Sequence, residues 1–374
     1  MLDRSSLRWI IPFTAIATIA ILSPARADEQ AKPNTLTPKE IEKGWLLLFD
    51  GETTFGWKVD GDAKVEKGVL ILGGAKQTTI TTMTPFGVAE LELECLQGEG
   101  KLHFHNEHNL STGSGGKKLL HKLSQAQCGE SYYVFFACCG NSIGDFAGYS
   151  YSLDARPTTS PVQITVPAGK TLQLQNIKLR PGEMQPVFNG KDLTGWKVFP
   201  GERYKSHFSV TNEGWLNVKN GPGDLQTDGQ YDDFILQLEC ISNGKALNSG
   251  VFFRCVAGQY QNGYEAQIQN GYKDGDRTRP VDYGTGAIYR RVPARKVVSN
   301  DHEWFTMTVA AQGKHIATWV NGYQTVDWTD ERQPNDNPRN GSKTGKGHIS
   351  IQGHDPTTDL SFRKIRIAEM PKDK

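Results

Sequence analysis

Apolar and polar side chains alternate with a period of two along much of the chain. In residues 236–240 the apolar positions are Leu236, Leu238 and Cys240, and the runs 316–320 and 349–352 repeat the pattern. This spacing predicts strands with one face turned to a core. The run 316–320 leads into an Asn-Gly pair at 321–322, which is typical of a two-residue hairpin turn. A helix start is indicated only at 37–44, which opens with Thr-Pro-Lys-Glu.

An internal repeat divides the chain. Segments 49–59 and 188–198 align without a gap and share Phe, two Gly, Trp, Lys and Val at equivalent positions. Segment 91–95 resembles 236–240, and 172–179 resembles 360–367. We therefore predict a linker at 28–43 followed by two β units, a divergent copy at 44–181 and a second copy at 184–371. Each copy is expected to be antiparallel, with two packed sheets.

The first residues have the pattern of a secretory leader. Arg4 and Arg8 precede an uncharged run from Trp9 to Leu22, and Ala25-Arg26-Ala27 offers a small-x-small cleavage site. This predicts a signal peptide at 1–27 and a periplasmic or secreted protein with no stable membrane insertion after leader removal. An uncleaved anchor is the alternative, although the run is shorter than the roughly 20 residues that a spanning helix needs.

Charge, cysteine content and the motifs that are absent limit the classes of partner, cofactor and metal site that the sequence predicts. Lys plus Arg number 42 against 41 for Asp plus Glu, so no basic field predicts nucleic-acid binding. Six cysteines in an exported chain suggest some pairing, and Cys240 with Cys255 would flank a hairpin. No P-loop, dinucleotide fingerprint, nucleophile elbow or zincin helix is present, and we predict no cofactor. His103 and His105 share one face of a predicted strand, a spacing compatible with a metal, and His108 is nearby. No carboxylate or third ligand follows at a fixed offset, so no metal site is predicted.

The second copy carries the candidate site. Alternation places two polar sets on neighbouring strand faces: Asn248, Gly250, Phe252 and Arg254 on one, and Glu265, Gln267 and Gln269 on the other. Such a surface suits a polyol, because each group bonds a hydroxyl in a fixed direction. The alternative is a solvated sheet face with Arg254 and Glu265 as a surface pair. Further polar candidates lie in the loop and strand ends that follow: Asp282, Tyr289, Arg290, Arg291 and His354.

Several motifs together resemble one known family. They are Phe188-Asn-Gly-Lys-Asp-Leu-Thr-Gly-Trp196, Asn248-Ser-Gly-Val-Phe-Phe-Arg254, Tyr264-Glu-Ala-Gln-Ile268, Thr285-Gly-Ala-Ile-Tyr289, Val320-Asn-Gly322, Gly347-His-Ile-Ser-Ile-Gln-Gly-His354 and Phe362-Arg-Lys-Ile365. The set resembles the 3-keto-disaccharide hydrolase family, also described as 3-keto-glucoside lyase/hydratase. The resemblance covers nearly the whole second copy, whereas the first copy shows it only at its two ends. It implies an all-β fold, here two tandem concanavalin A-like jelly-roll β-sandwich domains.

The resemblance also implies a reaction. A ketone at C3 of a glycoside acidifies the C2 proton, so a base can form an enolate that expels the C1 substituent before water adds. We expect Glu265 or His354 to be the base and Arg254, with Tyr289, to stabilise the negative charge. Asn248, Gln267 and Gln269 are expected to hold sugar hydroxyls. A non-catalytic lectin-like protein and a surface scaffold are the competing readings, because this fold serves several tasks.

Overall fold

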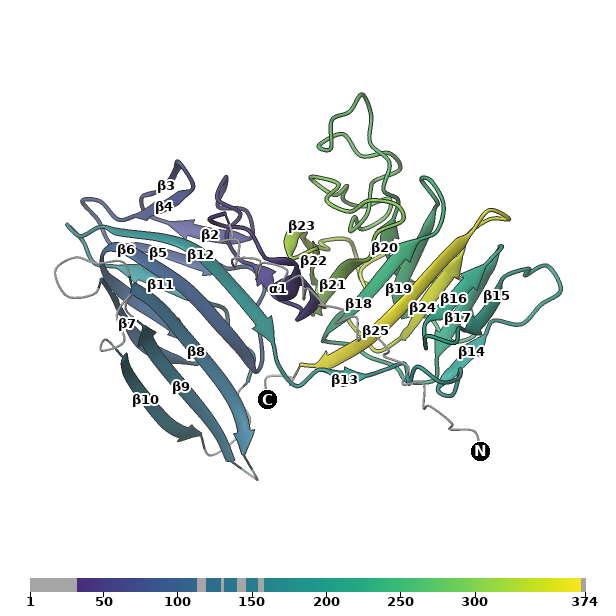
Figure 1. Ribbon diagram of the computed structural model, residues 1–374, viewed down its shortest axis with the longest axis horizontal. Coiled ribbons are helices and arrows are strands. Elements are labelled where there is room, and N and C mark those ends of the chain that lie inside the picture. Colours follow the sequence, from purple (N-terminus) through teal and green to yellow (C-terminus); the bar gives the residue numbers. More distant parts are fainter. Residues whose placement is uncertain (1–31, 113–118, 129–130, 140–145, 154–157, 371–374) are drawn as a thin grey trace, which may run out of the picture. The chain divides into compact units, whose positions relative to one another are not determined.

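The computed structural model describes residues 32–112, 119–128, 131–139, 146–153 and 158–370, and Figure 1 shows their arrangement as a ribbon. The predicted leader at 1–27 lies outside these residues. One short helix, α1 (Pro38–Glu42), begins where the sequence predicted a helix start. Its capping box joins Thr37 and Glu40, each side chain accepting from the other residue's backbone N–H.

In the first half, the described residues form a sheet system of twelve strands organised around the long strand β6. β6 pairs with β7, β8, β11 and β12, so it belongs to both sheet surfaces of this half. The strands are β1 (Leu46–Leu47), β2 (Trp57–Asp60), β3 (Ala63–Glu66), β4 (Val69–Leu72), β5 (Thr78–Thr82), β6 (Ala89–Phe104), β7 (Asn106–Ser111), β8 (Leu119–Cys128), β9 (Ser131–Cys139), β10 (Phe146–Leu153), β11 (Gln163–Val166) and β12 (Leu172–Pro181).

The second half consists of two antiparallel sheets. The eight-stranded sheet contains β13 (Gln185–Pro186), β15 (His207–Val210), β16 (Leu216–Lys219), β18 (Phe234–Ser242), β21 (Phe305–Gln312), β22 (His315–Val320), β23 (Tyr323–Thr329) and β25 (Asp359–Glu369). The five-stranded sheet has the order β14 (Trp196–Val198), β17 (Gly223–Thr227), β24 (His348–Gly353), β19 (Ser249–Cys255) and β20 (Tyr264–Ile268) (Figure 1).

Apolar side chains from both sheets of the second half form one core. Leu236 and Leu238 of β18 belong to it, together with Val251, Ile349 and Ile351 of the five-stranded sheet. The predicted alternation is thus confirmed. The hairpin between β22 and β23 is also confirmed, since Asn321 and Gly322 both have positive φ values, 49° and 76°, as a type I′ turn requires.

The all-β class is confirmed, and two sheets face one core in the second half. The division into tandem domains stays a prediction. Trp319 of β22 packs with the core residues of the first half and donates from Nε1 to the Leu47 carbonyl at 3.2 Å. In the described part of the chain, no helix is long and apolar enough to cross a bilayer.

The predicted bridge between Cys240 and Cys255 is wrong. Both residues are buried free thiols, as is Cys95. The reason is topological, because β18 and β19 do not form a hairpin. β18 pairs with β21 and β25 in the eight-stranded sheet, whereas β19 pairs with β20 and β24 in the five-stranded sheet.

Candidate functional site

The five-stranded sheet has one apolar face and one polar face. The apolar face, which includes Leu225, Val251 and Ile351, belongs to the core. On the opposite face the strand register creates two cross-strand rows: Asp224, Gln352, Gly250 and Gln267 in one, and Gln226, Ser350, Phe252 and Glu265 in the other. The sequence predicted the β19 and β20 members of this surface, whereas the contribution of β17 and β24 follows only from the register.

A pocket of about 400 Å³ lies over the polar face. That volume falls within the range of small-molecule sites. Its lining contains five residues that the sequence had singled out, namely Asn248, Glu265, Tyr289, Arg290 and His354. The other lining residues are Pro222, Tyr260, Gln261, Arg339 and Gln352. The structure therefore brings together part of the predicted set and adds residues from loops far away in the sequence.

Glu265 lies on β20 and is only 5% exposed. Its side chain lies across Gly250 of the neighbouring strand, because a Cβ added at position 250 would be 2.7 Å from Oε1 of Glu265. Glycine at 250 thus leaves room for the carboxyl group. On the other side, Nη2 of Arg339 lies 3.4 Å from Oε2 of Glu265.

Burial changes the acidity of two carboxyl groups on this face. Burial raises the pKa of Glu265 to about 7, with nearby Asp282 and Asp224 raising it further and Arg339 lowering it. Burial likewise raises the pKa of Asp224 to about 7. Asp224 accepts from the backbone N–H of Gln261 at 2.9 Å through Oδ2, while its buried Oδ1 lacks a protein partner among the described residues. Near neutral pH each group is therefore present in both its protonated and its ionised form.

Arg339 is the cation that faces Glu265. Its Nε donates to the Gln261 carbonyl at 2.9 Å, and its guanidinium lies 5.2 Å from the ring centroid of Phe252. These contacts fix the group over the sheet. No motif in the sequence marked Arg339, because it lies in an irregular segment between β23 and β24.

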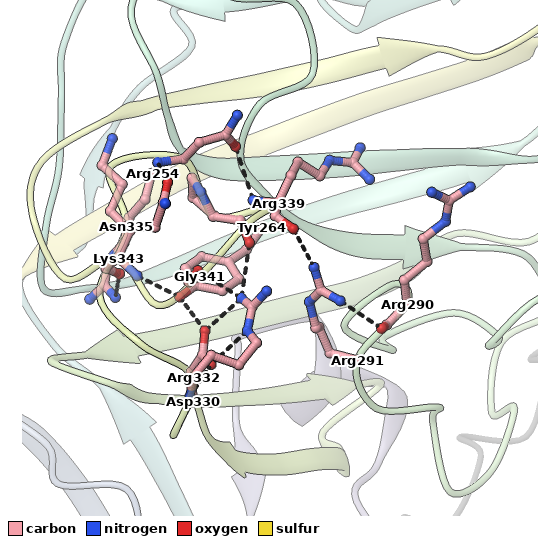
Figure 2. Close-up of polar contacts among 12 residues, drawn as sticks. Arg254, Tyr264, Arg290, Arg291, Asp330, Arg332, Asn335, Arg339, Gly341 and Lys343 are labelled. Carbon is pink, nitrogen blue, oxygen red and sulfur yellow. Dashed lines mark hydrogen bonds and ion pairs between the residues drawn. The ribbon is translucent and has the colours of Figure 1, made fainter.

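A network of arginine contacts shapes the segment that presents Arg339 (Figure 2). Arg332 forms a two-pronged pair with Asp330, at 2.8 and 2.7 Å, and also donates to the carbonyls of Pro338 and Gly341. Arg291 donates to the Arg339 carbonyl at 2.8 Å. These hydrogen bonds therefore hold the segment in place on both sides of Arg339.

Tyr264 anchors the same segment to β20, as Figure 2 shows. Its hydroxyl donates to Asp330 Oδ2 at 2.7 Å and accepts from the backbone N–H of Lys343 at 2.8 Å. Tyr264 and Glu265 are neighbours that point to opposite faces of β20. One strand therefore holds the carboxyl group and the base of the loop that supplies its cation.

Arg254, predicted to stabilise negative charge in the site, does not line the pocket. A register shift between Phe252 and Cys255 interrupts the alternation, and Arg254 has a φ of 51°. Its side chain is fully buried, and the guanidinium donates to the carbonyls of Asp232, Gly313 and Lys343 and to the Asp233 carboxylate. These bonds engage the guanidinium within the protein, so Arg254 stabilises the fold around the site and does not contact the pocket.

Gln267 and Gln269, predicted to bind hydroxyls, also lie outside the pocket lining. Gln267 is fully buried and donates to the carbonyl and the carboxylate of Asp282 at 3.0 and 3.1 Å. Gln269 donates to the Ala246 carbonyl and accepts from the Gly271 N–H. Both amides brace the loop that follows β20 because its backbone groups need partners once they are buried.

That loop delivers Tyr289 and Arg290 to the pocket. The backbone N–H of Tyr289 donates to the Glu265 carbonyl at 2.9 Å, which fixes the loop beside β20. The Arg290 guanidinium lies 5.3 Å from the Tyr289 ring centroid. Asn248 joins the loop from the other side by donating to Asp282 Oδ2 at 2.8 Å.

His354 follows β24 and lies on the accessible side of the pocket. Its Nδ1 is 2.9 Å from Asp355 Oδ2, and 40% of the side chain is exposed. The two candidate bases thus share one pocket but differ in environment, since Glu265 is buried and His354 is half-exposed. The described residues hold no cluster of three or more His, Cys, Asp or Glu side chains placed to bind a metal.

Comparison with known proteins addresses the second half. Residues 183–368 match the model of the 3-keto-alpha-glucoside-1,2-lyase-like domain. They belong to this family. The predicted family is therefore confirmed for the part of the chain that carries the pocket, and that part is a domain of a carbohydrate-active family. The match does not extend into the first half.

Solved structures with similarity to the chain were also found. Two crystal structures of candidate glycosyl hydrolases from Parabacteroides distasonis have 22% and 26% identity, TM-scores of 0.41 and 0.39, and coverage of 50% of this chain and 94% and 100% of theirs. The carbohydrate-binding module CBM66 from Bacillus subtilis has 14% identity and a TM-score of 0.33, covering 48% of this chain and 97% of its own. Among curated proteins, no match reaches significance.

Proposed function

We propose that the protein cleaves 3-keto-glycosides by elimination followed by hydration. The observation that carries this proposal is the state of Glu265, a buried carboxyl group with a pKa of about 7 that faces a fixed guanidinium in a pocket of this family. A base whose pKa lies near the working pH combines a useful ionised fraction with a useful basicity.

The proposed reaction needs one base, the substrate and water. Glu265 takes the proton from C2, and the electron pair of that bond forms an enolate with the C3 ketone. The enolate re-forms the ketone as the C1–O bond breaks, and the departing oxygen takes a proton to leave as an alcohol. Water then adds to C1 of the resulting enone, while C2 regains a proton from Glu265. The net result is hydrolysis with the carboxylate restored.

Two arginines take the role that the sequence assigned to Arg254. Arg339 and Arg290 line the pocket and are close enough to lower the pKa of Glu265, so their positive field reaches the reacting end. A positive group aimed at developing charge on the ketone oxygen stabilises the transition state more than the ground state. Asn248 and Tyr289 also line the pocket, and we assign them the binding of sugar hydroxyls.

The pocket differs from that of an ordinary glycosidase. Most glycosidases use two carboxyl groups, one on each side of the glycosidic bond. Among the described residues that line this pocket, Glu265 is the one carboxyl group. An elimination needs a single base at C2, so this lining fits the proposed reaction better than direct displacement at C1.

His354 is the second candidate base. Its contact with Asp355 orients the ring, and its exposed position suits proton exchange with the departing alcohol or with water. We assign it that proton transfer, and Glu265 the C2 proton.

Turnover of a 3-keto-glucoside, compared with the same glucoside lacking the ketone, tests the proposal. We expect products from the keto sugar alone, loss of turnover in Glu265→Gln, and a smaller loss in His354→Ala. Exchange of the C2 hydrogen with deuterated solvent reports the first step separately. Binding of both sugars without turnover would favour a lectin-like protein, and absence of any sugar effect on Tm would favour a scaffold.

We also propose that the enzyme works outside the cytoplasm, in the periplasm or after secretion. The support is the sequence pattern at 1–27, with its two early arginines, uncharged run and Ala-Arg-Ala site.

A further inference from the structure

Three aromatic rings gather at one side of the pocket. Phe199 and Tyr204 come from the loop between β14 and β15, and Tyr260 comes from the loop between β19 and β20. The ring centroids of Tyr204 and Tyr260 are 4.5 Å apart, and Phe199 lies 5.3 and 5.7 Å from these two rings. Tyr260 itself lines the pocket, so the cluster is continuous with it.

The strand register places this cluster on the same face as the proposed base. The backbone N–H of Phe199 donates to the Asp224 carbonyl at 2.8 Å, which extends the pairing of β14 with β17 by one residue. Phe199 is therefore in register with Asp224, next to Gln352, whereas Glu265 lies on β20 at the far edge of the sheet. The face thus runs from aromatic at β14 to acidic at β20.

The cluster is not part of the hydrophobic core. None of the three rings belongs to the core of this half, and all three are half-buried. The guanidinium of Arg203 lies 4.8 Å from the Tyr204 centroid and 5.8 Å from that of Tyr260. Partly exposed aromatic surface beside a polar pocket suits a ligand with a flat apolar face.

Hydrogen bonds hold both loops in place before any ligand arrives. Gln261 donates through its side chain to the Tyr260 hydroxyl at 2.8 Å and through its backbone to Asp224. On the other loop, the backbone N–H of Lys205 donates to the Pro222 carbonyl at 2.7 Å. A preformed surface of this kind loses little conformational freedom on binding.

We propose that Phe199, Tyr204 and Tyr260 form the subsite for the leaving group, and that this subsite selects a ring with a flat apolar face. The inference rests on the proposed function, because it places the keto sugar at Glu265 and its C1 substituent toward β14. Both a phenolic ring and a second pyranose ring have the required face. The size of the subsite's contribution should be that of an aromatic contact, roughly a tenfold change in kcat/KM.

Kinetics with three 3-keto-glucosides of one anomeric series test the subsite, the leaving groups being methanol, phenol and glucose. The variant is Tyr204→Ala, because Tyr204 does not line the pocket that holds the base. Each rate is expressed relative to the unmodified protein with the same substrate, which cancels the intrinsic reactivity of the leaving group. Tyr204→Phe keeps the ring, and Tyr272→Ala removes an exposed tyrosine outside the pocket lining as the matched control.

We expect Tyr204→Ala to lower kcat/KM roughly tenfold for the ring-shaped leaving groups, mainly through KM, and less than twofold for methanol. Tyr204→Phe, which retains the ring, should retain the preference for ring-shaped leaving groups, and Tyr272→Ala should leave all three rates within twofold. A loss with phenol only, or glucose only, identifies which ring the subsite takes. Equal losses for all three substrates, or no loss for either ring-shaped leaving group, overturn the proposal. If Tyr204→Ala lowers Tm, Phe199→Ala must show the same pattern of losses.

Absence of turnover in the unmodified protein would reject the proposed function separately. Calorimetric titration with phenyl and methyl glucosides then still tests the subsite. It predicts tighter binding of the phenyl glucoside and loss of that preference in Tyr204→Ala. Failure to bind the phenyl glucoside, or a preference unchanged in the variant, overturns the inference.

Discussion

At the scale of single residues, the acidity of Glu265 depends on what surrounds it. Its position on β20 buries the carboxyl group, and Gly250 on the next strand leaves the space that it fills. Burial raises the pKa, nearby Asp282 and Asp224 raise it further, and Arg339 lowers it. The balance leaves a proton acceptor that ionises near neutral pH.

Replacing Glu265 by Gln should remove activity and change stability in a pH-dependent way. We expect kcat to fall by about 10²- to 10⁴-fold, as for loss of a general base. Since the folded pKa is about 7 and the usual value is 4.5, wild-type stability decreases as pH rises through this window. Glu265→Gln should therefore raise Tm at pH 8 and leave it unchanged below pH 4, as measured by calorimetry. Glu331→Gln, at an exposed position, is the control. A lower Tm of Glu265→Gln at pH 8 would show that the ionised Glu265 carboxylate does not destabilise the fold.

Asp224 should influence the reaction through Glu265. Its negative charge is one of the groups that raise the pKa of Glu265, along with Asp282, and Arg339 and Arg290 oppose them. Asp224→Asn is expected to shift the acidic limb of the kcat/KM profile to lower pH. A profile that stays in place, with Tm preserved, would show that the two carboxyl groups are not coupled.

Gly250→Ala should displace the Glu265 side chain. The new methyl group would lie 2.7 Å from Oε1, closer than carbon and oxygen tolerate without movement. We expect a loss of activity of tenfold or more with a smaller effect on global stability. Gly345→Ala is a matched control because a Cβ there meets nothing within 4 Å. Equal activity of the two variants would contradict the described placement of Glu265.

At the scale of elements, irregular segments complete a site whose floor is a regular sheet. The sheet supplies Glu265 and Gln352, while the segment between β23 and β24 supplies Arg339. Polar contacts of Arg332, Asp330 and Tyr264 fix that segment. A charged side chain on an irregular segment can face a buried carboxyl group only when such contacts restrict it.

Arg332→Ala should therefore reduce activity without touching substrate. The variant removes donors to Pro338 and Gly341 and leaves the buried Asp330 carboxylate with fewer partners. We expect kcat/KM to fall roughly tenfold and Tm to drop by several degrees, because an under-satisfied buried charge is costly. Arg279→Ala, which breaks an exposed pair with Asp274, serves as the control in the same assays. Unchanged kinetics of Arg332→Ala would show that the segment between β23 and β24 does not support the site.

At the scale of the whole molecule, the two halves differ in how much they share with the family. The match covers residues 183–368, and the pocket lies within that range. The first half repeats the opening and closing segments of the second but carries none of its pocket residues. The predicted repeat is thus a repeat of framework segments, while the polar face of β17, β19, β20 and β24 belongs to the second half.

Export predicts a processed N-terminus. In a host that recognises the leader, we expect mature protein beginning at Asp28 in the periplasmic or culture fraction, as shown by intact mass. Ala27→Lys should block processing, whereas Lys32→Ala, beyond the proposed site, should not. Full-length protein in the cytoplasm would contradict the proposal.

Local patterns predicted much of the framework. Period-two alternation, the Asn-Gly turn at 321–322 and the helix start at 37–44 all depend on a few neighbouring residues, so the sequence carries their full signal. Of the five pocket residues that the sequence singled out, Asn248, Glu265 and His354 lie on strands or at strand ends, whereas Tyr289 and Arg290 lie in the loop after β20. The prediction that Arg254 faces the site was wrong because one extra residue in a bulge interrupts the alternation, and no local sequence pattern indicates that bulge.

The sequence by itself determined the all-β class, the repeat and the polar face of β19 and β20, since strand geometry ties neighbouring side chains to alternate faces. Only the tertiary structure decided which strands lie beside these two, that Cys240 and Cys255 belong to different sheets, and that Arg339 rather than Arg254 faces Glu265. These outcomes depend on contacts between residues far apart in the chain. Their geometry is set by strand order and loop packing, which no short stretch of sequence encodes.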